Sequence, residues 1–309
     1  MDQTISVCSP GAYENCRICP RRCGVNRAAG QTGYCHAPAD CYVARAALHF
    51  WEEPCLSGTR GSGTVFFSGC SLGCVYCQNA AIRSQMQGQI RTPRQLADDF
   101  LDLQEQGGHN INLVTTAHYL PHVIQALELV RGGALRIPVV YNSGGYESVE
   151  SLKALEGLVD IYLPDLKTLS PERGRKYSHA EDYPSVATDA IEEMVRQTGP
   201  FELDAEGLMR RGVIVRHLIL PGGREDAKAV IRYLYERYGD RIYLSLMSQY
   251  TPVLPEAERE RFPELARRLR RREYDRVVDY AISLGVTNAF VQEGRVAKES
   301  FIPDFSQFS

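Results

Sequence analysis

The sequence predicts an α/β fold: a partial (β/α)6-type TIM-like barrel behind a small, cysteine-rich, metal-binding N-terminal cap. Beyond residue 60, short apolar runs alternate with longer segments whose apolar residues recur at helical spacing, which is typical of parallel β/α units. Several of these runs are apolar throughout, as expected for strands buried on both faces. Strands are expected at 64–69, 111–115, 137–142, 158–163, 213–220, 242–247 and 288–292.

Helices are expected between these strands. Thr92 followed by Pro93 is a typical helix start, and Leu96, Phe100 and Leu103 then recur at helical spacing. Similar patterns predict helices around 123–130, 148–156, 185–197, 225–238 and 272–284. Six or seven β/α units make a barrel or partial barrel, whose chemistry is expected at the carboxyl ends of the strands.

Three segments are predicted along the chain. Residues 1–60 are rich in cysteine and glycine and show little periodicity. This indicates a segment with a small apolar core whose fold is stabilised by a bound metal. Residues 61–295 form the barrel, and residues 296–309 are expected to pack on it as an extended tail.

Composition excludes some classes of partner. The chain has 309 residues, of which 44% are hydrophobic, enough for one large folded domain and a small appendage. Its net charge is −3, and its one basic run, 267–272, is flanked by acidic residues, so no nucleic acid partner is expected. No apolar stretch has the ~18 residues of a membrane span, and the N-terminus does not resemble a signal peptide, so we expect a cytoplasmic protein.

The ten cysteines all lie in the first quarter of the chain. In a chain of this size without a signal peptide, clustered thiols favour metal binding over disulfides. One group contains Cys16, Cys19, Cys23 and Cys35, and a second contains Cys70, Cys74 and Cys77.

The second group directly follows an expected strand, so it lies in a loop at the catalytic end of the barrel. Cysteine thiolates are the usual ligands of a [4Fe–4S] cluster, and three of them leave one iron open to chelate the amino and carboxylate groups of a methionine moiety. The alternatives are a zinc site or three incidental buried thiols, but zinc usually completes four ligands and no fourth cysteine follows.

The first group supplies four thiolates within twenty residues, enough for one closed tetrahedral site. Zinc and an auxiliary iron–sulfur cluster both suit such ligands, and the spacing does not decide between them. We favour the cluster slightly.

The arrangement C-x3-C-x2-C, with an aromatic residue before the last cysteine, resembles the signature of the radical SAM superfamily. Further segments resemble an uncharacterised group of that superfamily, similar to pyruvate formate-lyase-activating enzymes: 16–20, 49–58, 66–79, 110–115, 141–147, 160–167, 216–222 and 247–250. The resemblance covers nearly the whole chain and implies a radical enzyme that uses S-adenosylmethionine.

The resemblance also implies roles for single residues. Cys70, Cys74 and Cys77 would bind the cluster, and Lys167 joins them as a catalytic candidate. The cofactor-binding candidates are Tyr76, Gln78 and Asn79 after the cluster strand, Thr115, Thr116 and His118 after the second, Asn142 and Ser143 after the third, Asp165 and Lys167 after the fourth, and Arg216, Met247 and Gln249 on later strands. Arg216 would pair with a carboxylate of cofactor or substrate. The Gly-Gly-Glu motif that meets the methionine amino group in activating enzymes is absent here.

Three functions follow as hypotheses. The first is hydrogen abstraction from a small molecule or a peptide, and it is the one that we favour. The second is an activase that generates a glycyl radical on a partner enzyme, and the third is a non-catalytic zinc or iron–sulfur module. Either enzyme would work anaerobically and need a reductant such as flavodoxin or ferredoxin.

Overall fold

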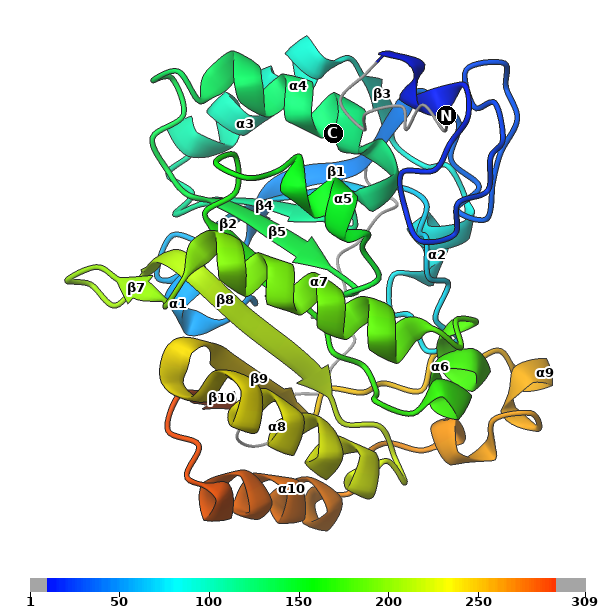
Figure 1. Cartoon of the computed structure of the whole chain (residues 1–309), viewed down its shortest axis with the longest axis vertical. Helices are drawn as coiled ribbons and strands as arrows, with labels where there is room; N and C mark the ends of the chain where they lie inside the picture. The colour runs from blue at the N-terminus through cyan, green and yellow to red at the C-terminus, as the bar shows by residue number, and fades with distance from the viewer. Residues whose placement is uncertain (1–9, 293–309) are drawn as a thin grey trace.

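A computed structural model describes residues 10–292, and a ten-stranded sheet lies at its centre (Figure 1). Seven of the described strands run parallel, and they overlap the seven expected runs. They are β2 (Ser62–Phe67), β4 (Ile111–Val114), β5 (Val139–Ser143), β6 (Ile161–Pro164), β8 (Met209–Leu218), β9 (Tyr243–Met247) and β10 (Ala289–Val291).

The sheet has the order β10-β9-β8-β6-β5-β4-β2-β1-β3, and β7 (Glu202–Leu203) attaches to β8. Among the described residues, the edge strands β10 and β3 are not paired with each other, so the sheet does not close into a full barrel. This is expected for a partial TIM-like barrel. The extended tail predicted at 296–309 lies outside the described residues.

Part of the cysteine-rich N-terminal segment pairs with the main sheet. Strand β1 (Cys41–His49) pairs antiparallel with β2, and β3 (Gln89–Arg91) pairs antiparallel with β1. Residues 41–49 therefore belong to the main sheet, although the sequence places them in the N-terminal segment that ends at residue 60. Three alanines in this strand weaken its sequence signal, because alanine has a low strand propensity.

Helices cover the outer face of the parallel strands (Figure 1). The helices of the described residues are α1 (Pro54–Ser57), α2 (Ala80–Ser84), α3 (Pro93–Glu105), α4 (Leu120–Val130), α5 (Val149–Lys153), α6 (Pro171–Ser178), α7 (Tyr183–Thr198), α8 (Arg224–Tyr238), α9 (Glu256–Arg259) and α10 (Arg271–Leu284), and the longer ones form this outer layer. Short 3-10 turns lie at Pro10–Tyr13, Ala117–Tyr119, Gly239–Arg241 and Pro263–Ala266. Among the helices of the described residues, none has the length and apolar character needed to cross a membrane.

Local signals explain where the first long helix begins. The Thr92 side chain accepts a hydrogen bond from the Gln95 amide while Gln95 caps Thr92 in return, and Pro93 occupies the first turn. Leu96, Phe100 and Leu103 are buried, so the apolar stripe of α3 faces the sheet, as expected.

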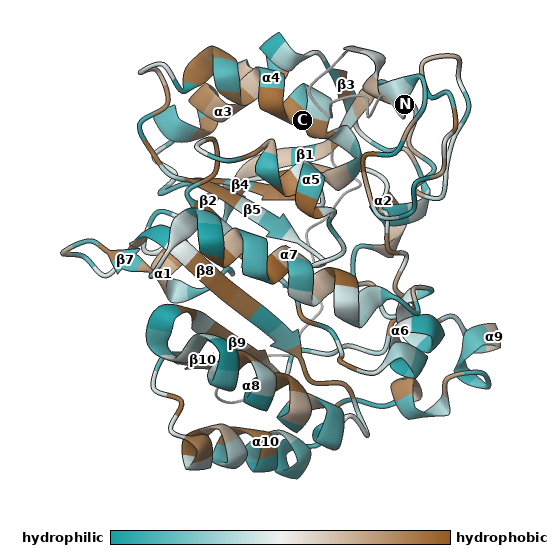
Figure 2. Ribbon diagram, in the orientation of Figure 1, coloured by the Kyte–Doolittle hydropathy of each residue, from teal (hydrophilic) through white to brown (hydrophobic). Residues whose placement is uncertain are grey.

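Side chains of the strands alternate between the helices and the barrel interior. On β4, Ile111 and Leu113 belong to the main apolar core, whereas Val114 packs in a separate small cluster with Phe66. Figure 2 shows the middle of β8 in brown, the colour of hydrophobic residues, where α7 and α8 lie beside it. Since residues two apart share a face, Asn112 points into the interior with Val114.

The contact between β1 and the segment after α2 leads to a stability prediction. Gly88 has a φ of +97°, and a Cβ added there would lie 2.0 Å from the carbonyl oxygen of Val43. We expect Gly88→Ala to lower the free energy of unfolding by about 2 kcal/mol or more, measured by denaturant titration. The matched control is Gly132→Ala, whose Cβ would meet no atom within 4 Å. Equal stabilities of the two variants would contradict the close approach of these backbones.

Candidate functional site

An open cavity lies at the carboxyl ends of the parallel strands. Its empty space, including the mouth, is about 1450 Å³. Fourteen of the sequence-predicted residues line it: Cys70, Cys74, Tyr76, Cys77, Gln78, Asn79, Thr115, Asn142, Ser143, Asp165, Lys167, Arg216, Met247 and Gln249. The fold thus brings these side chains together, while the role of each stays a prediction.

The three-cysteine loop follows β2 and forms one wall of the cavity. The Leu72 amide donates to Cys70 Sγ (3.4 Å), and Cys74 Sγ lies 3.2 Å from Ser178 Oγ. Burial raises the pKa of Cys74, and it raises the pKa of Cys77 to about 12 with a further contribution from the neighbouring thiols. Thiols crowded in this way ionise readily only beside a cationic partner, so this donor set fits an iron–sulfur cluster.

The N-terminal segment holds this loop from outside. The Arg21 guanidinium donates to the carbonyl oxygens of Ser71 (2.8 Å), Leu72 (3.2 Å) and His179 (2.7 Å). It stacks on the Tyr34 ring at 3.8 Å, and the Tyr34 hydroxyl donates to Leu72 as well (3.1 Å). Two residues of the four-cysteine segment therefore fix the backbone between the first two cysteines of the loop.

The four-cysteine group lies together in this segment. Cys16, Cys19 and Cys35 are buried, whereas Cys23 is exposed. Burial, with smaller contributions from the nearby Cys35 and Cys16, raises the pKa of Cys19 to about 12. Across residues 10–292, no three or more His, Cys, Asp or Glu side chains are arranged to hold a single metal ion. The second metal centre stays a prediction.

Asp165 and Lys167 form an ion pair at the carboxyl end of β6, with 2.5 Å between Nζ and Oδ2. Burial opposes the charge of Lys167, but Asp165 and Cys74 outweigh it, so the pKa of this lysine lies well above its ordinary value. Tyr183, from α7, donates to the Asp165 carbonyl oxygen (2.8 Å) and accepts from the Lys167 amide (2.9 Å). Lys167 is therefore a fixed cation within electrostatic range of Cys74.

Two further contacts fix the ends of strands at the cavity. Thr115 has a φ of +61°, a left-handed conformation that costs a β-branched residue about 1–2 kcal/mol. Its amide donates to the Asn142 carbonyl oxygen (2.9 Å), which ties the end of β4 to β5. Gln78 donates to the Gln249 carbonyl oxygen (2.9 Å), which ties the three-cysteine loop to the end of β9.

The structure places two predicted residues elsewhere. Thr116 and His118 are buried and do not line the cavity. His118 Nε2 lies 2.7 Å from the Ser68 carbonyl oxygen, and burial lowers the pKa of this histidine to about 3. His118 is thus a neutral group that supports the backbone before Cys70, because the 3-10 turn after β4 directs it inward.

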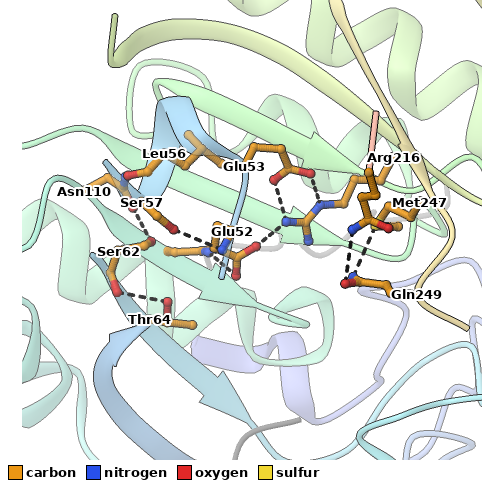
Figure 3. A network of polar contacts seen from close by, with 12 residues as sticks. Glu52, Glu53, Leu56, Ser57, Ser62, Thr64, Asn110, Arg216, Met247 and Gln249 are labelled. Carbon is orange, nitrogen blue, oxygen red and sulfur yellow. Dashed lines mark hydrogen bonds and ion pairs between the residues drawn. The ribbon is translucent and has the colours of Figure 1, made fainter. Parts of the chain in front are cut away.

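Arg216 has a different partner from the one expected. Its Nε and Nη2 donate to the Glu53 carboxylate at 2.8 Å and 2.6 Å, and Nη2 also contacts Glu52 (Figure 3). Two carboxylates of this chain therefore occupy the place that a carboxylate of the cofactor or substrate was predicted to take.

Sequence reasoning missed several residues of the cavity wall. His49, Trp51 and Glu52 come from the end of β1 and the turn after it, and Tyr146 and Glu147 follow β5. The acidic pair before Pro54 lies in a segment that the resemblance includes, but it had no assigned role. The pair has no role in the sequence prediction because that prediction does not include strand β1, which brings the pair to the barrel.

Comparison with known proteins identifies the family. The family model of the radical SAM superfamily matches residues 64–269, about two thirds of the chain. The chain belongs to the radical SAM superfamily. Membership implies a [4Fe–4S] cluster and S-adenosylmethionine, and the three thiols on the cavity wall have the chemistry that such a cluster requires.

Two known proteins are similar to this radical SAM protein. The uncharacterized protein MJ0674 of Methanocaldococcus jannaschii is 28% identical over 276 residues, covering 87% of this chain and 75% of that protein. The crystal structure of Streptococcus suis SuiB bound to precursor peptide SuiA superposes with a TM-score of 0.50 at 12% identity. That match covers 78% of this chain and spans about half of SuiB (51%), so it shows a shared fold.

The Arg21 contacts predict how the radical SAM loop is kept in place. We expect Arg21→Ala to lower stability by about 2–4 kcal/mol, because several charged hydrogen bonds to loop carbonyls are lost. It should also speed iron loss to a chelator from anaerobically loaded protein. Arg17→Ala, at an exposed position of the same segment, is the control. Iron release at the same rate from both variants would argue against a role for Arg21 in holding the loop.

Glu147 predicts a pH dependence of stability. Burial raises the pKa of Glu147 to about 8, and the Tyr141 hydroxyl donates to its carboxylate (3.0 Å). In the unfolded chain this carboxyl ionises near pH 4.5. The stability that protonated Glu147 contributes to the fold is therefore fully present below that pH and is lost as pH rises through about 8. Denaturant unfolding at pH 5, 6.5 and 8 should show Glu147→Gln gaining stability over wild type with rising pH, by ~3–4 kcal/mol in total.

The control for this series is Glu150→Gln, at an exposed position of α5. Its stability difference from wild type should be nearly the same at the three pH values. A difference between wild type and Glu147→Gln that does not change with pH would show that Glu147 is ionised in the folded protein.

Proposed function

We propose that this protein reductively cleaves S-adenosylmethionine at a [4Fe–4S] cluster held by Cys70, Cys74 and Cys77. The 5′-deoxyadenosyl radical so produced abstracts a hydrogen atom from a small molecule or a peptide. The observation that carries the proposal is the position of the three thiols on the wall of one large cavity at the carboxyl ends of the strands. That is where catalytic groups of such barrels lie.

The bound cluster supplies the electron, and the residues of this chain supply position and electrostatics. Lys167, held by Asp165, places a fixed positive charge within electrostatic range of Cys74. The Gln78 and Thr115 contacts fix three of the strand ends at the cavity.

The cavity leaves room for a substrate beside the cofactor. Its lining extends from the three-cysteine loop after β2 to Glu52, which follows β1, and to Arg216 on β8. SuiB, which shares the fold, is described as bound to a precursor peptide, and this supports a peptide as one substrate class. Abstraction from a glycine of a partner enzyme needs the same radical and is the alternative.

We further propose that flavodoxin or ferredoxin supplies the electron in the cytoplasm, where reducing conditions preserve such clusters. The four-cysteine group is proposed to bind a second metal, either an auxiliary iron–sulfur cluster or zinc. Arg21 and Tyr34 join the four-cysteine segment to the three-cysteine loop. Binding or loss of the second metal would therefore affect the loop directly.

The test is formation of 5′-deoxyadenosine from S-adenosylmethionine and dithionite by anaerobically reconstituted protein. We expect Cys74→Ser to reduce the product more than about 100-fold, because the cluster loses a ligand. Cys41→Ala removes a buried thiol outside both cysteine groups and should keep activity. Formation of the product by Cys74→Ser at the wild-type rate would refute the assignment.

The substrate class is tested separately. Peptide and small-molecule additives should increase 5′-deoxyadenosine formation if the favoured function is right. A protein-based radical, seen by electron paramagnetic resonance after incubation with candidate glycyl-radical proteins, would instead establish the activase.

A further inference from the structure

The inner end of the cavity holds more negative than positive charge. Glu53 is bound through both oxygens by Arg216, and Glu52 shares the same guanidinium. The three side chains are 5%, 7% and 14% exposed for Glu53, Glu52 and Arg216. Arg216 holds the pKa of Glu53 below its ordinary value, against the effect of burial. Among the described residues, one guanidinium faces two carboxylates, so this cluster carries one surplus negative charge away from bulk water.

At the same place, one buried side-chain oxygen lacks a hydrogen-bond donor among the described residues. Asn112 is fully buried, and its amide nitrogen donates to Glu52 Oε1 (3.0 Å). This fixes the orientation of the amide and leaves Asn112 Oδ1 without a hydrogen-bond partner among the described residues. The side chain shares the inward face of β4 with Val114, which lines the cavity. A buried carbonyl oxygen without a donor is costly, so it indicates a place for a hydrogen-bond donor.

The polar groups around this cluster satisfy one another (Figure 3). Ser62 donates to Asn110 Oδ1, Asn110 donates to the Leu56 carbonyl oxygen, and Thr64 donates to the Ser62 carbonyl oxygen. The Glu52 amide donates to Ser57 Oγ (3.0 Å). The imbalance is therefore confined to the Glu52 carboxylate and Asn112 Oδ1.

Other charged groups at the cavity do not remove the imbalance. Lys167 is paired with Asp165. Burial lowers the pKa of His49, which therefore stays neutral near pH 7, with Glu52 and Arg45 within electrostatic range. Arg45 does not line the cavity. Burial keeps Glu147 largely protonated, because it raises the pKa of that carboxyl to about 8.

We propose that Glu52 and Asn112 bind a primary ammonium group of the substrate, so that the substrate is an alkylamine, such as a peptide with a lysine side chain. An ammonium group has three donors, which can meet the Glu52 carboxylate and Asn112 Oδ1 together while neutralising the surplus charge. This inference rests on the proposed function, because it names the class of molecule that the radical attacks.

The position of the site favours the substrate over the cofactor as the source of the ammonium group. Asn112 lies two residues before Val114, the last residue of β4, and is therefore about 7 Å deeper in the barrel than the strand end at a rise of about 3.3 Å per residue. The amino acid end of S-adenosylmethionine is expected at the three-cysteine loop, which follows the end of β2. Glu52 therefore lies at the inner end of the cavity, where a substrate chain would terminate.

The test measures binding by calorimetry on anaerobic, iron-loaded protein that contains S-adenosylmethionine. The probes are N-acetyl-lysine methyl ester and its neutral analogue, N-acetyl-norleucine methyl ester. We expect wild type to bind the lysine probe about tenfold or more tightly than the norleucine probe. Glu52→Gln should lose this preference, and Glu52→Asp, which keeps the charge, should retain part of it. Trp51, the single tryptophan of the chain, lines the same cavity and reports binding by fluorescence.

Glu202→Gln, at an exposed position of β7, is the control for the loss of a carboxylate and should bind like wild type. Thermal unfolding verifies that each variant is folded. Equal affinity for both probes, no binding of the lysine probe, or unchanged binding by folded Glu52→Gln would overturn the proposal. A matching loss of affinity for S-adenosylmethionine itself would also overturn it, by assigning the site to the cofactor. Calorimetry requires no turnover, so failure here is distinct from a failure of wild type to form 5′-deoxyadenosine.

Discussion

Parallel pairing of seven strands is the constraint on which the site depends. Because every one of these strands ends at the same edge, side chains as distant in sequence as Cys70 and Gln249 line one cavity. A helix or a turn alone could not bring them together. The two antiparallel strands at one edge add a further source of side chains, since β1 leads directly into the Glu52 turn.

The charges of the cavity are held by partners within the chain. Lys167 is paired with Asp165, and Arg216 with Glu53 and Glu52, so the groups that line the cavity have fixed positions. Buried ion pairs contribute little net stability, because desolvation offsets their attraction, and their retention here is better explained by positioning. The same applies to Arg21, whose guanidinium organises carbonyl oxygens of the cluster loop.

Local patterns predicted much of the fold. The continuous apolar runs identified all seven parallel strands, and Thr92 with Pro93 identified the start of α3. Strand β1 was missed because Ala44, Ala46 and Ala47 weaken its pattern, and it forms through pairing with β2 rather than through local propensity. Helix α6 was missed because it is short and strongly polar.

The sequence by itself determined the family chemistry: the spacing of Cys70, Cys74 and Cys77 after an apolar strand, and the family to which that spacing belongs. Spacing along the chain is a local property, and a cluster-binding loop is a local motif. Only the tertiary structure decided that Arg216 pairs with Glu52 and Glu53 and that His118 is buried behind the three-cysteine loop. It also decided that Arg21 donates hydrogen bonds to the backbone of that loop. Those contacts join residues from separate elements, and their partners are set by strand order and burial, which no short stretch of sequence encodes.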